Sequence, residues 1–447
     1  MIQTEEVFMN ILQLEREIND ADFNTRIEAS RTIGNLIASK ELKRVQLQEV
    51  NNHVHTTYSF SPYEPAAAAY AAWKAGLGIV GSIDHDSIGA ADEMLVASQN
   101  LGIASTVGFE LRVSFLDTAL GNRKINNPDS QGIVYMCVHG VPQQKIAEVS
   151  AFLEPIHVQR NLRNKAQVEH LQSLVGTYGF DLDFERDVVP LSHAAQGGSI
   201  TERHILFAMA NQCIGMFGKG EKLVRFLQKD LQLPLSQTVQ SFLLDEKNPH
   251  YAYDLLGVFK SNFLSRFFIQ PTRDECPDVR DVVSFGNSIG AIPAYAYLGD
   301  VKESVTGDKK QEKFEDDYLV ELMDLLADIG YPAITYMPPR NTLSQMQRLQ
   351  NLAKERGMME ISGVDINSSR QSMNCPELLQ SCCSHLVASA WALVAHEKLA
   401  TCDPILGLFH PSNPLAALSL DQRLERYAEM GKKMDSRHPL DIIKYFD

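Results

Sequence analysis

The spacing of apolar residues in the first fifty positions predicts two helices. In residues 4–18, Val7 and Ile11 fall on one stripe, since residues three or four positions apart share a face of an α-helix. A second helical pattern follows Asp22, a residue type that caps the first turn of helices. We expect residues 1–49 to form a helical segment that docks on a larger body.

From residue 50 onward the pattern changes to short apolar runs separated by helices. The runs are GIVGSI at 78–83, IASTVGF at 103–109 and IVYMCVH at 133–139. Residues 65–74 favour a helix, because a proline opens the segment, alanines fill it and a glycine follows shortly after its end. This alternation predicts a parallel sheet with crossover helices, and residues 50–143 are its first part.

The strand pattern stops between residues 144 and 280, where long stretches of helical periodicity predict a mostly helical insertion. Within residues 281–375 strand patterns return, at 289–298, 331–337 and 359–366. Residues 376–447 contain apolar helices and end in a charged one, which predicts a helical C-terminal extension. The strand and helix units on both sides of the insertion are therefore expected to close into one barrel-like domain.

The composition is typical of a folded protein with one large or two to three ordinary domains. The chain has 447 residues, of which 44% are hydrophobic and 22% charged, and its net charge is −15. Such an acidic excess repels a phosphate backbone, so we expect no nucleic-acid polymer as a partner. A small phosphorylated ligand is allowed if local cations or metals reverse the sign.

The first residues and the cysteines favour the cytoplasm. The sequence MIQTEEVFMN lacks the basic and apolar regions of a secretory signal, and no apolar run reaches the roughly 18 residues that cross a bilayer. The seven cysteines include no CxxC pair, and in a reducing compartment they are most simply buried thiols. We expect a cytoplasmic protein with no membrane partner, and the sequence does not indicate its oligomeric state.

The clearest candidate for chemistry is the run NHVHT at 52–56. Side chains two positions apart on a strand project from the same face, so His53 and His55 can bind one metal ion. By itself this spacing is weak evidence, because two structural histidines also occur at it.

More candidate ligands come at or after the ends of the predicted strands. They are Asp84 and His85, Glu110, His139 and Asp365. Because the carboxyl ends of parallel barrel strands build active sites, we expect these side chains to meet at one end of the barrel. Ordinary polar residues at strand ends are the alternative interpretation.

The order of these motifs resembles the PHP superfamily, named for polymerase and histidinol phosphatase. HxHT, IDH, GxE, a strand-end histidine and a late GxD follow one another over roughly residues 50–145 and 285–370. The resemblance implies an α/β fold, a distorted (β/α)7 TIM-like barrel that holds two or three metal ions, and many members hydrolyse phosphate esters. The insertion resembles that of a subgroup acting on nucleotide phosphates. Its counterparts here are Arg160, Arg163 and Thr201-Glu202-Arg203-His204.

Carried over residue by residue, the resemblance implies a first metal ion held by His53, His55, Glu110 and Asp365. A second ion would share Glu110 and add His139. We therefore expect one or two divalent ions. A mixed set of histidines and carboxylates admits Zn, Mn or Fe.

The remaining ligand positions of the family are changed in this chain. Tyr297 stands where the second metal ion would have a further histidine. A third ion would use His85, but the other two positions hold Phe60 or Ser61 and Asn367. The third site is therefore expected to be lost and the second to be weakened.

Fixed cations and proton donors complete the predicted site. Arg340 suits bidentate binding of an oxyanion and Arg112 is a second candidate, with a surface salt bridge as the alternative for each. His85 is a candidate proton donor to the leaving group, although a hydrogen-bonded structural role fits it as well. Asp84 is expected to orient His85 or another ligand. Further candidates for contact with substrate are Tyr297, His204 and Asn367.

These features predict a metal-dependent hydrolase of phosphate esters that acts on a small phosphorylated metabolite or nucleotide through a metal-activated hydroxide. The insertion would form a lid that selects the substrate. One alternative is a binding or regulatory protein on a decayed PHP scaffold, which the changes at Phe60, Tyr297 and Asn367 support. The other is a metal-dependent hydrolase of a non-phosphate ester or an amide.

Overall fold

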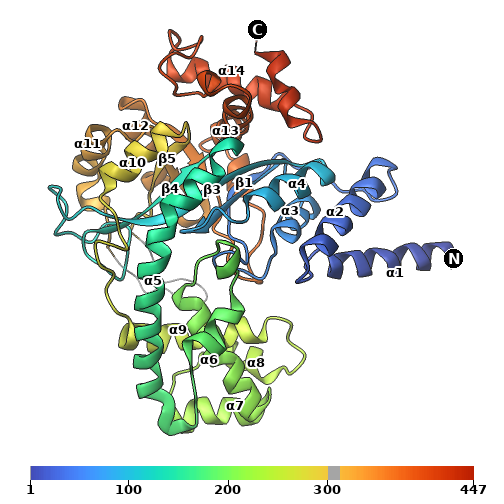
Figure 1. The fold of residues 1–447 in the computed structure, drawn as a ribbon, viewed down its shortest axis with the longest axis vertical. Coiled ribbons are helices and arrows are strands. Elements are labelled where there is room, and N and C mark those ends of the chain that lie inside the picture. The colour runs from blue at the N-terminus through green and yellow to red at the C-terminus, as the bar shows by residue number, and fades with distance from the viewer. Residues whose placement is uncertain (1, 301–312, 447) are drawn as a thin grey trace.

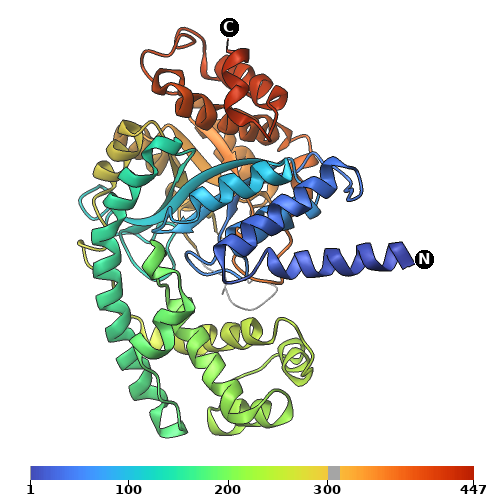
Figure 2. The same ribbon diagram turned by 45° about the vertical axis from the view of Figure 1, so that its right-hand side comes forward.

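Seven strands form one sheet that curls into a nearly closed barrel (Figures 1 and 2). The computed structural model describes residues 2–300 and 313–446, with only the backbone for residues 2–9. Around the sheet the strands follow in chain order: β1 (Val50–Val54), β2 (Ile79–His85), β3 (Ala104–Ser114), β4 (Ile133–His139), β5 (Ile292–Ala296), β6 (Ala333–Tyr336) and β7 (Met359–Ser362). The predicted α/β, TIM-like barrel is confirmed.

The segment that follows β7 closes the sheet against β1. Ile366 accepts a hydrogen bond from the N–H of His55 at 3.0 Å and donates one to the carbonyl of His53 at 3.2 Å. Gly363 is required in this segment, because a Cβ there would lie 2.5 Å from the Cβ of His53. The glycine of the GxD motif thus lets the last part of the barrel approach the strand that carries the HxH motif.

β4 runs against its neighbours, which corrects the expectation of an all-parallel sheet. It pairs antiparallel with β3 and with β5, whereas the other neighbouring strands are parallel. Residues 115–132, all of them described, connect β3 to β4 without a helix, whereas parallel strands are usually joined through one. The carboxyl end of β4 therefore lies at the opposite end of the barrel from those of the other strands.

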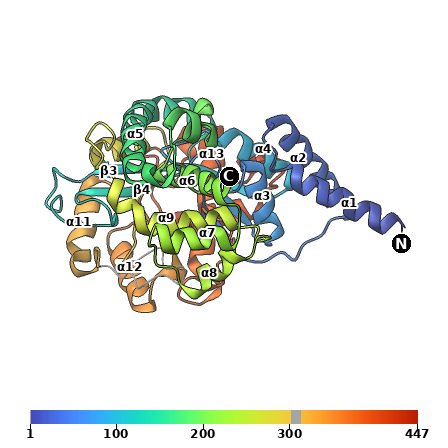
Figure 3. The ribbon, with the colours of Figure 1, turned by 90° about the horizontal axis from the view of Figure 1, so that it is seen from below.

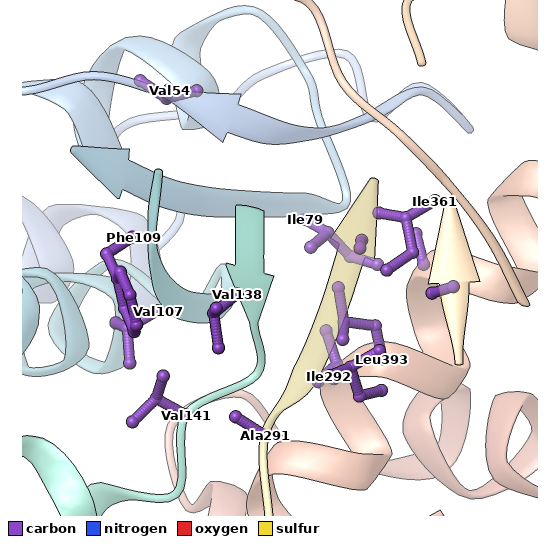
Figure 4. Packing of buried hydrophobic residues seen from close by; sticks show 14 of the residues in the cluster. Val54, Ile79, Val107, Phe109, Val138, Val141, Ala291, Ile292, Ile361 and Leu393 are labelled. Carbon is purple, nitrogen blue, oxygen red and sulfur yellow. The ribbon is translucent and has the colours of Figure 1, made fainter. Parts of the chain in front are cut away.

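Helices pack around the sheet and share one apolar core with it. They are α3 (Pro65–Lys74), α4 (Ala91–Leu101), α10 (Val279–Ser288), α11 (Leu319–Ile329) and α12 (Leu343–Glu355), with the short turns η7 (Asp316–Tyr318), η8 (Pro338–Arg340) and η9 (Pro376–Leu379). Val107, Phe109 and Val138 belong to this core (Figure 4). Each such side chain stabilises the fold by roughly 1.5–3 kcal/mol when it leaves water.

Helix α13 (Ser384–Cys402) closes the end of the barrel at which the parallel strands begin. The Glu397 carboxylate accepts a hydrogen bond from the N–H of Val107 in β3, and the Trp391 ring lies against Gly78, just before β2. Leu393 joins the barrel core (Figure 4). In Figures 1 and 2 the barrel accordingly lies between the C-terminal helices and the insertion.

The insertion is mostly helical, as predicted, and has an apolar core of its own. Its helices are α5 (Ile146–Val175), α6 (Glu202–Phe217), α7 (Glu221–Arg225), α8 (Gln237–Leu244) and α9 (Tyr251–Phe267), with the turns η1 (Gln143–Lys145), η2 (Gly176–Tyr178), η3 (Phe184–Val188), η4 (Val189–Leu191), η5 (Ala194–Gln196) and η6 (Phe226–Asp230). Viewed from below, these helices lie in front of the barrel (Figure 3). Phe60, from the loop after β1, belongs to the insertion core and packs against Phe207 and Tyr253 with ring centroids 5.5 and 5.7 Å apart.

A buried ionic network joins the insertion to the barrel. Arg112, near the end of β3, and Arg163, on α5, both pair with Glu275. These three side chains are 4%, 5% and 2% exposed. Arg163 also lies 2.8 Å from the carboxylate of Glu202 on α6. The network therefore connects β3 to two helices of the insertion.

The insertion also binds the loops that follow β1 and β2. Arg160 of α5 forms a buried ion pair with Asp86, directly after β2. Ser199 donates its hydroxyl proton to the carbonyl of His85 at 2.5 Å and its N–H to the carbonyl of Tyr58 at 2.7 Å. The insertion is thus attached at the end of the barrel where the parallel strands finish.

The remaining helices form the predicted N- and C-terminal extensions. They are α1 (Ile2–Glu17), α2 (Phe23–Ala38) and α14 (Leu420–Lys433), with the turns η10 (Pro404–Leu406) and η11 (Pro439–Tyr445). Arg26 of α2 donates two hydrogen bonds to Glu93 of α4, at 2.7 and 2.5 Å. Within the described part of the chain, no helix combines the length and the apolar character needed to cross a membrane. The domain boundaries drawn from the sequence stay a prediction.

Replacing Glu275 with Gln tests the contribution of the ionic network to stability. The change leaves Arg112 and Arg163 buried without this carboxylate, and we expect the free energy of unfolding to fall by about 3–5 kcal/mol. Urea unfolding followed by circular dichroism measures the loss. Asp117→Asn is the matched control, because Asp117 pairs with Arg273 on the surface with side chains 57% and 62% exposed. A much smaller loss is expected in the control, because water screens an exposed ion pair, and equal losses in the two variants would contradict the expectation.

Candidate metal centre

The four side chains predicted for the first metal ion meet at the end of the barrel to which the insertion is attached. His53 and His55 come from β1 and the residue after it, and their ring centroids lie 5.1 Å apart. Glu110 comes from β3, and Asp365 follows β7. Nε2 of His55 lies 3.3 Å from Oδ1 of Asp365. The strand-end pattern in the sequence therefore predicted a real cluster.

Glu110 is shared by three imidazole rings. Its Oε2 atom lies 2.9 Å from Nδ1 of His85 and 3.7 Å from Nε2 of both His53 and His55. Burial opposes ionisation of this carboxyl group, but His85 and His53 outweigh burial and hold the pKa of Glu110 well below its ordinary value. The carboxylate is therefore ionised and can lie between two cations.

Asp84 and Ser59 fix the orientation of His55. Asp84 accepts hydrogen bonds from the N–H and the hydroxyl of Thr56, at 2.7 and 2.6 Å, and from the hydroxyl of Ser59 at 2.6 Å. Because Ser59 donates its proton to Asp84, its oxygen accepts from Nδ1 of His55, 3.3 Å away. Nε2 of His55 then carries a lone pair that faces two carboxylates. Acceptors that converge in this way need a cation between them or an added proton.

The donor set fits divalent metal ions. Three overlapping groups of described residues bring their ligand atoms within 4.8 Å of one another: His53, His55 and Asp365; His53, Glu110 and Cys137; His55, His85 and Glu110. Burial, followed by the nearby His85, lowers the pKa of His55, which favours the neutral imidazole that metals bind. At His53, Cys137 and Glu110 outweigh burial and raise the pKa, so a metal ion bound there would displace a proton. Six residues exceed the four ligands of one tetrahedral zinc ion. The cluster therefore has enough donors for two ions with Glu110 between them.

Cys137, rather than His139, lies in the cluster on β4, and the role of His139 as a metal ligand stays a prediction. Because β4 runs backwards, Cys137 lies directly opposite Glu110, and its sulfur groups with Glu110 and His53. His139 lies two residues nearer the closed end of the barrel, beside Gly108, and among the described residues it belongs to none of these groups. It is fully buried, and burial lowers its pKa to about 3. The sequence did not single out Cys137, because its position opposite Glu110 depends on the direction of β4.

Asn367 connects Asp365 to the insertion. Its Nδ2 atom donates to Oδ1 of Asp365 at 2.6 Å, while its Oδ1 and its carbonyl accept from Arg203 of α6 at 2.6 and 2.9 Å. Asn367 thus positions a candidate ligand, and its contact with substrate stays a prediction. Phe60, at another changed ligand position, packs in the insertion core.

Of the predicted catalytic residues, His85 belongs to the cluster and Arg340 lies beside it. His85 stacks on His55 with ring centroids 4.5 Å apart. Arg340, in η8, and Asp365 line one pocket of about 220 Å³. Asp84, the third, supports His55 through Ser59, in agreement with the expectation that it orients a ligand.

Three predicted substrate contacts lie outside the cluster. Arg112 belongs to the buried ionic network rather than to a surface salt bridge. The hydroxyl of Tyr297 donates to Asp316 at 2.5 Å. His204 is buried at the start of α6, where its Nδ1 atom accepts a hydrogen bond from the N–H of Thr201 at 3.0 Å. Each polar group therefore has a partner within the protein.

No protein-family model and no curated protein matches the chain. Solved structures resemble it, among them the following two. A candidate metal-dependent phosphoesterase from Bifidobacterium adolescentis has a TM-score of 0.48 and 17% identity over 74% of this chain and 94% of that one. An amidohydrolase from Chromobacterium violaceum, with bound sulfate and no metal, has a TM-score of 0.47 and 16% identity over 73% of this chain and 90% of that one.

The barrel and its cluster fit a PHP-like fold. The sheet has seven strands and is nearly closed, and histidine, glutamate and aspartate side chains converge at one end of it. At the identities and TM-scores above, the activity of neither solved protein transfers to this chain. The PHP-like centre is therefore interpreted from its own residues.

Ser59→Ala tests whether the hydroxyl of Ser59 orients His55. Without it the imidazole can rotate, and we expect metal affinity to fall about ten- to a hundredfold, as for other residues that orient ligands. Isothermal titration calorimetry with Zn²⁺ or Mn²⁺ measures the change. Ser98→Ala is the control, since Ser98 is also buried but its hydroxyl contacts Met94 on α4. Unchanged affinity in Ser59→Ala would show that the orientation of His55 has another origin.

Proposed function

We propose that this chain is a metal-dependent hydrolase of phosphate esters that acts on a small phosphorylated metabolite or nucleotide. The observation that carries the proposal is the convergence of His53, His55, Glu110 and Asp365 at one end of the PHP-like barrel. A divalent ion, when bound there, supplies a Lewis acid that acidifies water and neutralises phosphoryl oxygens. The protein side chains provide substrate binding, orientation and proton transfer.

Arg340 binds a phosphoryl oxygen in this proposal. It lines the same pocket as Asp365, so an anion held by its guanidinium group is also close to a metal ligand. The pocket of about 220 Å³ is smaller than the roughly 300–1,000 Å³ of sites that enclose a drug-sized molecule. It therefore suits a phosphoryl group, with the rest of the substrate outside it.

His85 transfers a proton to the leaving oxygen. Its Nδ1 atom faces Glu110, so Nε2 is the atom available on the other side of the ring. The His85 side chain is 28% exposed, compared with 9% for His53 and 1% for His55, which makes it the imidazole of this cluster that substrate reaches most easily. General acid catalysis of this kind contributes about 10²- to 10⁴-fold to a rate.

The insertion covers the site and limits access of water. Ser199 binds the carbonyl of His85, and Arg203 binds Asn367, which in turn holds Asp365. These contacts place the insertion directly against two residues of the cluster. A cover of this kind strengthens electrostatic interactions below it and selects substrates by shape.

A screen of phosphomonoesters, with and without added Mn²⁺, Fe²⁺ or Zn²⁺, tests the function on protein of measured metal content. We expect the wild-type protein to hold metal and to release phosphate from at least one ester, and His53→Ala and Asp365→Ala to lose both properties. His170→Gln, on the exposed face of α5, is the control. Bound metal without phosphatase activity would favour hydrolysis of another ester or an amide. Little metal and no turnover would favour a binding protein.

Arg340→Met tests the phosphoryl contact. Loss of a charged hydrogen bond costs about 1.5–3 kcal/mol, so kcat/KM is expected to fall roughly ten- to a hundredfold. Steady-state kinetics measures the change, and Arg340→Lys should recover part of it because the charge returns without the planar fork. Arg356→Met is the control, since Arg356 pairs with Asp324 on the outer face of the barrel. A kcat/KM equal to that of the control would show that Arg340 does not bind the phosphoryl group.

A further inference from the structure

The strand β4 presents a sulfur atom to the cluster. Cys137 and Glu110 lie directly opposite each other in an antiparallel ladder, so their side chains project from the same face of the sheet. Sγ of Cys137, a carboxylate oxygen of Glu110 and a ring nitrogen of His53 lie within 4.8 Å of one another, and all three residues are buried. The thiol therefore lies at the distances expected of a metal ligand.

His139 provides a second observation on the same face of β4, two residues nearer the closed end of the barrel. It follows Cys137 by two positions, so it projects from the same face of β4. Its side chain is fully buried, and neither ring nitrogen has a hydrogen-bond partner in the described part of the protein. Buried imidazoles are nearly always hydrogen-bonded or bound to metal. The ring nitrogens of His139 therefore need a binding partner that the described residues do not provide.

We propose that Cys137 is a metal ligand through its thiolate and that the ion bound by His53, Glu110 and Cys137 is Zn²⁺. The inference depends on the metal centre of the proposed function. On binding, the thiol releases its proton to solvent and a sulfur–metal bond forms. Thiolate and imidazole ligands select zinc, whereas carboxylates and water suit manganese.

The two sides of the centre then differ in metal preference. Cys137 is the one cysteine, among those the structure describes, that belongs to a group of candidate ligands. The group of His53, His55 and Asp365 contains only nitrogen and oxygen donors. A harder ion suits that side, and zinc suits the side of β4.

Cobalt substitution tests the sulfur ligand. Thiolate bound to Co²⁺ gives an intense near-ultraviolet charge-transfer absorption, whereas nitrogen and oxygen ligands do not. The full-length protein, stripped with a chelator and reloaded with Co²⁺, is expected to show this band. Cys137→Ser is expected to lose it, and Cys213→Ser is expected to keep it, because Cys213 is equally buried but lies in the insertion core on α6. The wild-type spectrum decides the matter even if Cys137→Ser does not fold.

Competition between Zn²⁺ and Mn²⁺ gives an independent measurement. Cys137→Ser is expected to lose zinc affinity by about tenfold or more, with a much smaller effect on manganese, and Cys137→Asp to shift the preference toward manganese. Wild-type protein that binds Co²⁺ without the band, or Cys137→Ser with unchanged zinc affinity, overturns this inference and leaves the proposed function intact. Wild-type protein that binds none of these ions overturns both.

Discussion

One carboxylate oxygen, Oε2 of Glu110, lies within 3.7 Å of three imidazole nitrogens, and the candidate centre depends on it. A buried carboxylate is costly unless positive charge compensates it. The imidazoles that surround it come from the neighbouring parallel strands β1 and β2, whose ends meet the end of β3. Gly363 then permits the close approach that brings Asp365 to the same place. The close approach that completes the barrel therefore also brings the charged groups of the site together.

The insertion is attached through the residues that the centre needs. Arg203 reaches Asp365 by way of Asn367, and Ser199 binds the backbone of His85. These contacts position candidate ligands from the side of the insertion, while Asp84 and Ser59 position His55 from within the barrel. Differences from the PHP ligand pattern are thus compatible with an organised site, because Asn367 supports the candidate ligand Asp365.

The sequence predicted those parts of the structure that depend on local periodicity. His53 and His55 share a face because strand side chains alternate, and the helical insertion was recognisable from its apolar spacing. The direction of β4 was not recognisable from the sequence, since it depends on the loop after β3. The position of Cys137 in the cluster was not predicted for that reason. The sequence also did not indicate that the hydroxyl of Tyr297 binds Asp316, nineteen positions away. Partners distant in sequence, as in the buried ionic network, leave no local pattern.

Phe60 links the thermal stability of the insertion to the occupancy of the barrel. Its side chain completes the insertion core, but its backbone belongs to the loop that carries Ser59 and follows His55. A ligand that binds only the folded state raises the melting temperature of every part that unfolds with its site. A cation held by His55 would therefore also protect the insertion core from heat, to the extent that this core unfolds together with the loop after β1.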